Sequence, residues 1–255
     1  MQFIGTHTEE TAQRIVRSFG HTEQLISAIT AMFIRREDPL PCRQWPWHNQ
    51  LLLEISDIKD ARGVKEWQSI GREVRSGANA LWLLTPCTMP ILVQNCFGEE
   101  VECHTVFAYR SEPVYPVEDT VGMPSRTMPA LCGNRIKHLP IWDIAQTIHS
   151  HESFFCEQSS FVELIRSEDQ RLYKPRKDVR LGEIVAAIGA AVLFECIEEP
   201  REVCLNKASN CLARHARMAN TSLFPVCLEV LDRVCESVAT VLNTAESLQS
   251  LVIPA

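Results

Sequence analysis

Basic and aromatic side chains are concentrated in one segment of the sequence, from Arg43 to Arg75. This segment holds six Lys or Arg and five Asp or Glu residues, a net charge of +1, whereas the whole chain of 255 residues carries −7. Four of the five tryptophans lie in or near it: Trp45, Trp47, Trp67 and Trp82. Single-stranded nucleic acid binds to such a mixture, because bases stack on aromatic rings and phosphates attract cations.

The same residues have a purely structural interpretation. A tryptophan at helix or strand spacing usually belongs to the core, and we expect this of Trp67 and Trp82. Trp45 and Trp47 flank Pro46 and precede three polar residues, so both interpretations stay open for them. Both also stay open for Arg72 and Arg75, because loops often carry solvated charges.

Composition narrows the class of protein. A pI of 5.7 excludes a histone-like polycation, and a hydrophobic content of 45% excludes a wholly disordered chain. The longest uncharged apolar run, Ile184 to Phe194, has eleven residues, too few to span a bilayer. We therefore expect no membrane association.

The N-terminus and the cysteines predict a cytoplasmic protein. Residues 1–10 have neither a basic region nor an apolar core, so no secretory signal is expected. The eleven cysteines include no CxxC pair, which favours reduced thiols that pack as small hydrophobic side chains. Their spacing does not match a metal cluster, and we predict neither a metal nor another cofactor.

Hydrophobic periodicity predicts an α+β fold. The first half has a helical pattern over residues 8–35, a short helix over 61–70 capped by Asp60, and β-compatible runs at 80–84, 91–93, 105–108 and 114–117. These runs predict a small antiparallel sheet. The segment 119–136 is rich in Pro and Gly and predicts a linker. The second half is mainly helical, over 140–149, 158–168, 182–197, 203–217 and 222–250.

An ordered set of motifs in the first half resembles the N-terminal domain of ArdC-type antirestriction proteins. The motifs are Trp45-x-Trp47-His48-Asn49-Gln50-Leu51-Leu52, Asp60-Ala61-Arg62-Gly63, Trp67-Gln68, Gly71-Arg72-x-Val74-x-x-Gly77 and Leu84-x-Pro86-Cys87. The resemblance covers roughly residues 20–120, including the segment 112–120, which is similar to the closing strand of that domain. It implies binding of single-stranded DNA and an origin on a plasmid or phage.

The second half resembles the zincin-type metallopeptidase part of the same family. Residues 182–196 are similar to its second active-site helix, and residues 226–245 to its terminal helix. The family's HExxH helix corresponds to Val162-Glu163-Leu164-Ile165-Arg166, where Glu163 is kept and both histidines are replaced. Val162 has no donor atom, and Arg166 is a permanent cation.

Two further departures concern the same half. The position four residues after Glu183, often a second Glu in the family, is Ala187, and only 22 residues separate Leu139 from Val162. That stretch is about half as long as the strand-containing one expected from the resemblance. We therefore predict a degenerate zincin-like half with no catalytic residue and no metal, in which Val162, Glu163, Arg166 and Glu183 are the remnants of the metal site.

The sequence thus predicts a domain at 1–122 that binds single-stranded DNA and a degenerate zincin-like helical domain at 137–255. In the first, Trp45, Trp47 and His48 would stack on bases, Asn49 and Gln50 would donate hydrogen bonds, and Arg62, Lys65, Arg72 and Arg75 would contact phosphates. The chain would act as a non-catalytic accessory or antirestriction-like protein of a mobile element. An alternative of another class is a protein-interaction module that docks onto a larger nucleoprotein or defence complex. An active zinc metallopeptidase is the third possibility.

Overall fold

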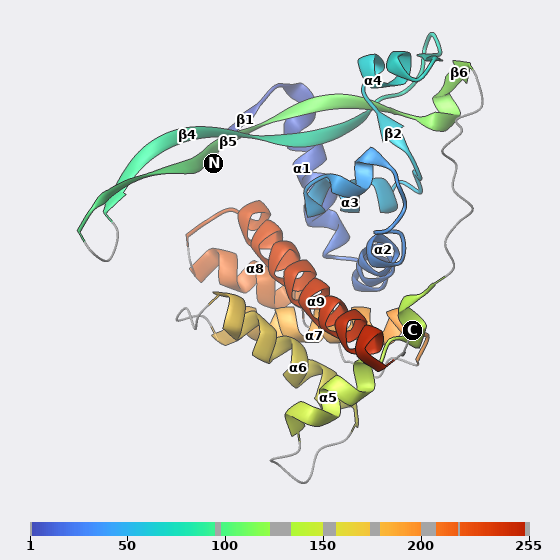
Figure 1. Cartoon of the computed structure of the whole chain (residues 1–255). Coiled ribbons are helices and arrows are strands. Elements are labelled where there is room, and N and C mark those ends of the chain that lie inside the picture. The colour runs from blue at the N-terminus through green and yellow to red at the C-terminus, as the bar shows by residue number, and fades with distance from the viewer. Residues whose placement is uncertain are drawn as a thin grey trace. The chain divides into compact units, whose positions relative to one another are not determined.

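A computed structural model describes residues 2–94, 98–122, 134–149, 157–173, 179–199, 208–218 and 220–252 (Figure 1). The chain divides into two compact units, of which unit 1 comprises residues 1–14 and 58–125 and unit 2 comprises 15–57 and 126–255. The sheets lie in unit 1, and unit 2 is helical, which confirms the predicted α+β class.

Unit 1 is built around a long antiparallel hairpin. Its strands are β4 (Leu81–Gln94) and β5 (Glu100–Pro116), which pair over their whole length with a bulge between Cys87 and Thr88. Two short strands add to the other edge of β5: β1 (Gln2–Ile4) runs parallel to it and β2 (Ala61–Arg62) antiparallel. The four predicted β segments are therefore parts of only two long strands.

A smaller sheet lies at the open end of the hairpin, where β4 begins and β5 ends. Strand β3 (Arg72–Val74) pairs antiparallel with β6 (Thr120–Gly122), and the helix α4 (Val64–Ser69) packs on β3. The predicted helix over 61–70 is shorter than expected because Ala61 and Arg62 extend the sheet. Gly63, and not Asp60, is the cap of α4.

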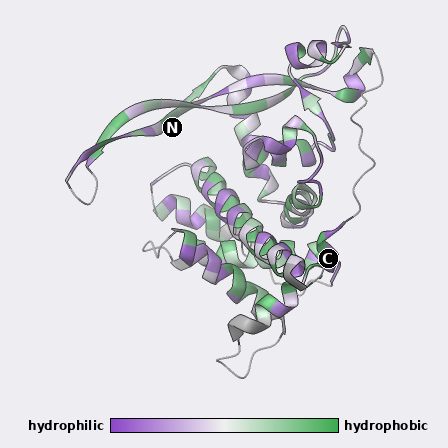
Figure 2. Cartoon of the chain, viewed as in Figure 1, coloured by the Kyte–Doolittle hydropathy of each residue, from purple (hydrophilic) through white to green (hydrophobic). Residues whose placement is uncertain are grey.

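The core of unit 2 is a bundle of amphipathic helices. These are α2 (Thr22–Ile34), α3 (Trp47–Glu54), α5 (Ile141–His149), α6 (Glu157–Tyr173), α7 (Val179–Cys196), α8 (Ala208–Met218) and α9 (Leu223–Val252). Helix α7 packs against α2, α6 and α9, and its segment 184–194 is almost wholly buried. Figure 2 shows hydrophobic and hydrophilic residues along α9, as expected from its apolar stripe.

The helical pattern over residues 8–35 corresponds to two helices in the structure. Helix α1 (Thr6–Ser18) ends before Gly20, and α2 starts at Thr22. Helix α2 packs against α7 and α3 packs against α9, so residues 15–57 belong with the helical second half. The observed division differs in this respect from the predicted one, 1–122 and 137–255, because the apolar faces of α2 and α3 find their partners in the bundle. Residues 123–133 of the predicted linker lie outside the described residues.

A buried ion pair joins helices α6 and α9 inside the bundle. The Arg233 guanidinium on α9 donates from Nε to Oδ1 of Asp169 on α6 at 2.8 Å and from Nη2 to Oδ2 at 2.6 Å, and both side chains are buried. Such a two-point pair fixes the register of the two helices, because a guanidinium and a carboxylate match in only one relative orientation.

Four cysteines are buried among apolar side chains, as expected of small hydrophobic residues: Cys42, Cys196, Cys227 and Cys235. Burial raises the pKa of Cys196 and of Cys227 to about 12, so both thiols stay protonated at neutral pH. Among the described helices, none is both long enough and apolar enough to cross a membrane.

Gly189 sets the distance between α6 and α7. A Cβ at this position would lie 2.8 Å from Cγ2 of Ile165, which is fully buried on α6, whereas a Cβ at Gly182 would meet its nearest neighbour at 3.7 Å. We expect Gly189→Ala to destabilise unit 2 by up to about 2 kcal/mol, because the overpacking costs about 1–3 kcal/mol and the gain in helix propensity is about 1 kcal/mol.

Gly182→Ala is the matched control, because it makes the same change in the same helix without the close contact. It is expected to be neutral or to stabilise the chain. Urea unfolding followed by circular dichroism measures both variants. Equal unfolding free energies for the two would contradict the close contact between α6 and α7.

Candidate nucleic-acid interface

The predicted DNA-binding residues fall into two groups that belong to different units. Trp45, Trp47, His48, Asn49 and Gln50 are in unit 2, at the start of α3. Arg62, Lys65, Arg72 and Arg75 are in unit 1, on β2, α4, β3 and the turn after β3. Each group is therefore described by itself.

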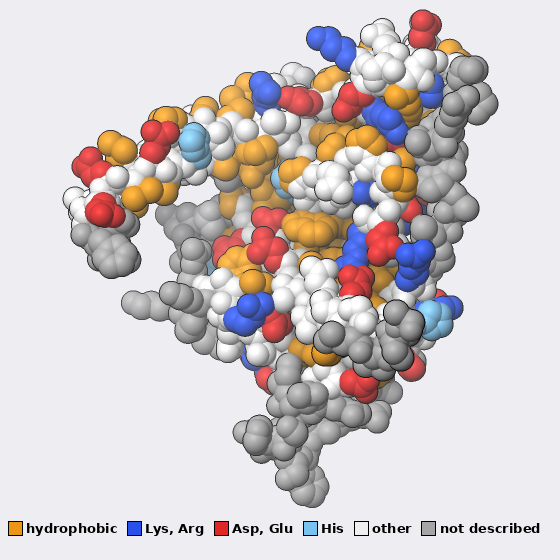
Figure 3. Space-filling model, viewed as in Figure 1, with side chains coloured by type: hydrophobic (Ala, Val, Ile, Leu, Met, Phe, Trp, Pro, Cys, Tyr) orange, Lys and Arg blue, Asp and Glu red, His pale blue; other side chains and the backbone are white. Residues whose placement is uncertain are grey.

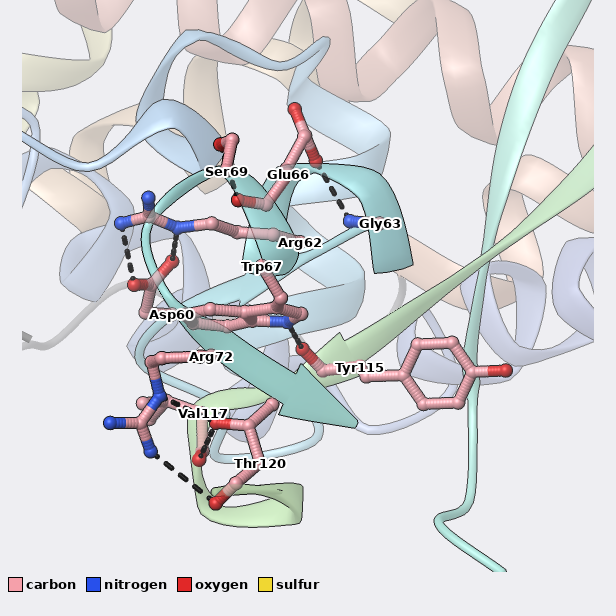
Figure 4. Close-up of polar contacts among 10 residues, drawn as sticks. All are labelled: Asp60, Arg62, Gly63, Glu66, Trp67, Ser69, Arg72, Tyr115, Val117 and Thr120. Atoms are coloured by element: carbon pink, nitrogen blue, oxygen red, sulfur yellow. Dashed lines mark hydrogen bonds and ion pairs between the residues drawn. The ribbon is translucent and has the colours of Figure 1, made fainter. Parts of the chain in front are cut away.

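Trp67 is the centre of the group in unit 1 (Figure 4). It is fully buried, and its indole Nε1 donates to the backbone carbonyl of Tyr115 at 2.9 Å. The guanidinium carbon of Arg62 lies 5.0 Å from the ring centroid, and that of Arg72 lies 5.9 Å away. Trp67 is therefore structural, as the sequence suggests, and two arginines are held against its ring.

Arg62 is engaged inside unit 1. Its side chain is buried, and it donates from Nε to Oδ1 of Asp60 at 3.2 Å and from Nη2 to Oδ2 at 2.9 Å. The phosphate contact of Arg62 stays a prediction, and its burial and its paired charge argue against that role. Asp60 directly precedes β2, so the pair forms at the start of this strand.

Arg72 is half-buried and attaches β3 to β6. Its Nε donates to Oγ1 of Thr120 at 2.7 Å, and its Nη2 to the carbonyl of Thr120 at 3.3 Å. Thr120 in turn donates to the carbonyl of Val117 at 2.8 Å. These bonds hold the Arg72 guanidinium at the β3–β6 edge of unit 1.

Lys65 and Arg75 are the exposed cations of this group. Lys65 lies in the first turn of α4, and Arg75 follows β3, where its backbone N–H donates to the carbonyl of Asp119 at 2.9 Å. Within the described residues neither side chain takes part in an ion pair. Figure 3 shows Lys and Arg side chains at this end of unit 1 and acidic side chains along the hairpin.

The group in unit 2 is more enclosed than the sequence suggests. Helix α3 begins at Trp47 directly after Pro46, which places His48, Asn49 and Gln50 in its buried first turns. The amide of Gln50 donates to the carbonyl of Trp45 at 2.7 Å and to that of Arg43 at 3.1 Å. Their predicted contacts with DNA are not tested, and burial argues against them, because a buried amide that leaves its partners pays a desolvation cost.

Trp45 and Trp47 are half-buried, and they keep part of their rings accessible. The ring of Trp47 packs on Phe33 of α2 with centroids 5.6 Å apart. In the same unit Arg43 donates to Oε1 of Glu54 at 2.6 Å, and Arg35 donates to Oε2 of Glu54 at 2.8 Å. Trp45, which has no such ring contact among the described residues, is the better candidate for base stacking.

Three of the four predicted remnants of a metal site, Glu163, Arg166 and Glu183, come together on α6 and α7, but they do not fit a metal ion. Arg166 is hydrogen-bonded to Glu163, and its Nη2 donates to Oε2 of Glu183 at 3.0 Å. Burial lowers the pKa of Arg166, but the two carboxylates outweigh it and raise the pKa above its ordinary value. A guanidinium thus pairs both acids, and Val162 offers no donor atom. The described residues contain no cluster of three His, Cys, Asp or Glu side chains suited to a metal.

Two solved structures are similar to this chain, both of the antirestriction protein ArdC from the R388 plasmid. The metal-free structure is 13% identical, with a TM-score of 0.48, and the likeness covers 90% of this chain and 98% of ArdC. The Mn(II)-bound structure is 10% identical, with a TM-score of 0.46, over 89% and 97% of the two chains. No family model matches the sequence, and no curated protein does. At these values the likeness assigns no site and no activity to the chain.

The buried Asp60–Arg62 pair predicts a large effect of a single substitution. In Asp60→Ala the Arg62 guanidinium stays buried without its carboxylate, which costs about 3 kcal/mol. We expect amide hydrogen exchange in β2, α4 and β3 to accelerate about 100-fold, while exchange in α7 and α9 is unchanged. Mass spectrometry of peptides from the full-length chain measures both.

Glu73→Ala is the control for this prediction, because Glu73 is an exposed acid in the neighbouring strand β3. It is expected to leave exchange in unit 1 unchanged. The structural role of the pair would be refuted if both variants exchanged at the same rate as the wild type.

Proposed function

We propose that this chain is a non-catalytic protein that binds single-stranded DNA, an accessory or antirestriction-like protein of a mobile element such as a plasmid or phage. The observation that carries the proposal is the set of cations on α4, β3 and the following turn, where Lys65 and Arg75 are exposed. Arg72 belongs to the motif series that resembles the ArdC N-terminal domain, and Lys65 and Arg75 lie between matched residues of that series. In the proposed complex they contact phosphates, and Trp45 stacks on a base.

The structure of unit 1 supports a rigid phosphate-binding edge. Arg72 is fixed by Thr120 and lies against Trp67, which cannot move because it is fully buried and hydrogen-bonded to Tyr115. A cation held in place loses little side-chain entropy when it meets a phosphate. Acids near Lys65 and Arg75 limit the affinity: Glu66 accepts a hydrogen bond from the backbone N–H of Gly63, and Glu73 is exposed.

The proposed lack of catalysis rests on Arg166. Hydrolysis by a zincin needs an ion that activates water next to a free Glu, whereas Glu163 is paired with a guanidinium here. Glu183 is paired with the same guanidinium, and Val162 cannot coordinate. The cation that pairs with both acids is therefore a side chain of the protein and not a metal ion. In this proposal unit 2 serves as a folded support.

Fluorescence anisotropy with a labelled polythymidine oligonucleotide tests DNA binding. For Lys65→Ala/Arg75→Ala we expect weaker binding and a log–log salt slope that is smaller in magnitude by about 1.4, because each phosphate contact on single strands contributes about 0.7. Arg214→Ala/Arg217→Ala on α8 is the matched control, with the same change in net charge at exposed positions. Trp45→Ala is expected to weaken binding by about 1–3 kcal/mol.

Two results would contradict this proposal. One is the absence of binding by the wild type at low salt and micromolar concentration, which would leave docking onto a larger complex as the function. The other is equal loss in the two double variants, which would mean that net charge alone attracts DNA.

Elemental analysis of the purified full-length chain tests the non-catalytic half of the proposal. After incubation with zinc and dialysis without chelator, we expect the chain to retain less than about one tenth of an equivalent of zinc, the level of adventitious metal. The variant Val162→His/Arg166→His restores two imidazoles around Glu163 and is expected to take up more zinc than the wild type. One tightly held zinc per wild-type chain would refute the proposal.

A further inference from the structure

We infer that the outer half of the β4–β5 hairpin is a docking surface for a second copy of this chain. We call this part, residues 88–94 and 100–107, the arm. The inference is independent of DNA binding, since the arm contains no Lys or Arg. It rests on the register of the two strands, on which side chains share a face, and on where the charges lie.

The register gives the arm one apolar face. Val93 lies opposite Val101, and Ile91 lies opposite Cys103. Alternate residues on a strand point to the same side, so these pairs share a face with further residues of both strands. We define the apolar face as Met89, Ile91, Val93, Val101, Cys103 and Thr105, all of which are uncharged.

The opposite face carries the acidic residues of the arm. There Leu92 lies opposite Glu102, Gln94 opposite Glu100, and Pro90 opposite His104. Hydrophilic and hydrophobic residues alternate along β5 from Glu100 to His104, whereas β4 carries the apolar run Ile91–Val93. The arm is therefore an amphipathic two-stranded ribbon.

The apolar face is exposed and lacks support from other strands of the described chain. The large side chains on it are exposed by 38–47%. Strands β1 and β2 pair with β5 only at residues 108–110 and 115–116, beyond the arm. A two-stranded ribbon is at best marginally stable in water unless its apolar face is covered. This face is thus suited to a partner surface.

The charge pattern favours a second copy as that partner. The apolar face carries no charged residue, whereas Glu100 and Glu102 project from the other side. When two apolar faces meet, the glutamates of both copies stay in water and apart from each other. Nucleic acid and anionic lipid are disfavoured by these acids, and a basic protein would be attracted to the other face.

The sizes of the side chains fit a two-fold arrangement. Met89 is long and lies toward the base of the arm, whereas Val93 is short and lies toward its tip. A two-fold axis that runs between two stacked ribbons, parallel to the line from Ile91 to Cys103, places Met89 of one copy against Val93 of the other and Thr105 against Val101. The gap between the two ribbons is then even along their length, as close packing requires.

The free edge of the hairpin is a poorer site than the face. Pro86 and Pro90 both lie in β4, which pairs only with β5 among the described strands. Proline has no N–H, so an added strand would lack donors at these two positions. We therefore place the contact face to face, at the spacing of about 10 Å that stacked sheets adopt.

The apolar face is short, so the dimer is weak. With a rise of about 3.3 Å per residue, the span from Met89 to Val93 on β4 extends over less than about 20 Å. This covers less than the roughly 800 Å² per partner of a standard stable interface. Dimers are therefore expected to form as the concentration rises from micromolar to hundreds of micromolar.

Sedimentation velocity of the full-length chain over this range tests the inference. The wild type is expected to shift from monomer to dimer, and Ile91→Lys is expected to stay monomeric, because it sets two cations against each other at the axis. Leu92→Lys is the matched control: the neighbouring residue receives the same lysine on the other face and is expected to dimerise like the wild type. An equimolar mixture of Ile91→Lys and Ile91→Glu is expected to form a heterodimer.

Cross-linking adds a second readout at the axis. A short bis-maleimide is expected to join two wild-type chains through Cys103, and the joined species is expected to be lost in Cys103→Ser. The inference is overturned by a wild type that stays monomeric at the highest concentration. It is also overturned if Ile91→Lys and Leu92→Lys behave alike, or if Ile91→Lys lowers the melting temperature of a monomeric chain, since the face would then be covered within one chain.

Discussion

A guanidinium that leaves water needs a carboxylate, and both units of this protein depend on that requirement. In unit 1 the pair of Arg62 and Asp60 lies beside Trp67. In unit 2 Arg233 pairs with Asp169, and Arg43 with Glu54, at buried positions. The two pairs of unit 2 join different segments, α6 with α9 and residues 41–44 with α3, whereas the pair of unit 1 lies between near neighbours in the chain at the start of β2.

The same requirement changes how the charge of the sequence relates to function. Arg43 and Arg62 add to the positive charge of the segment from Arg43 to Arg75, but both are buried and paired in the structure. Only part of that charge faces solvent, chiefly at Lys65 and Arg75. The proposed interface for DNA is therefore smaller than the sequence suggests: its exposed cations lie in unit 1, and Trp45 lies in unit 2. On α6 and α7, Arg166 similarly pairs with two acids that the resemblance would assign to a metal.

The arm of the hairpin differs, because its large apolar side chains are exposed. Its uncharged face is apolar, and its acids occupy the other face. A protein core is closed by many elements at once, whereas a two-stranded ribbon can cover neither of its own faces. The face that is left is uncharged, and this is why a second, identical face is its best match.

By itself the sequence determined the fold class, the helices from residue 141 onward and the burial of Trp67, because each depends on local periodicity or on the size of one side chain. Only the tertiary structure decided that residues 15–57 belong with the helical bundle and that four β segments form two long strands. It also decided that Arg62, Asn49 and Gln50 are buried. These features depend on contacts between residues far apart in the chain, and such contacts leave no pattern in a local stretch of sequence.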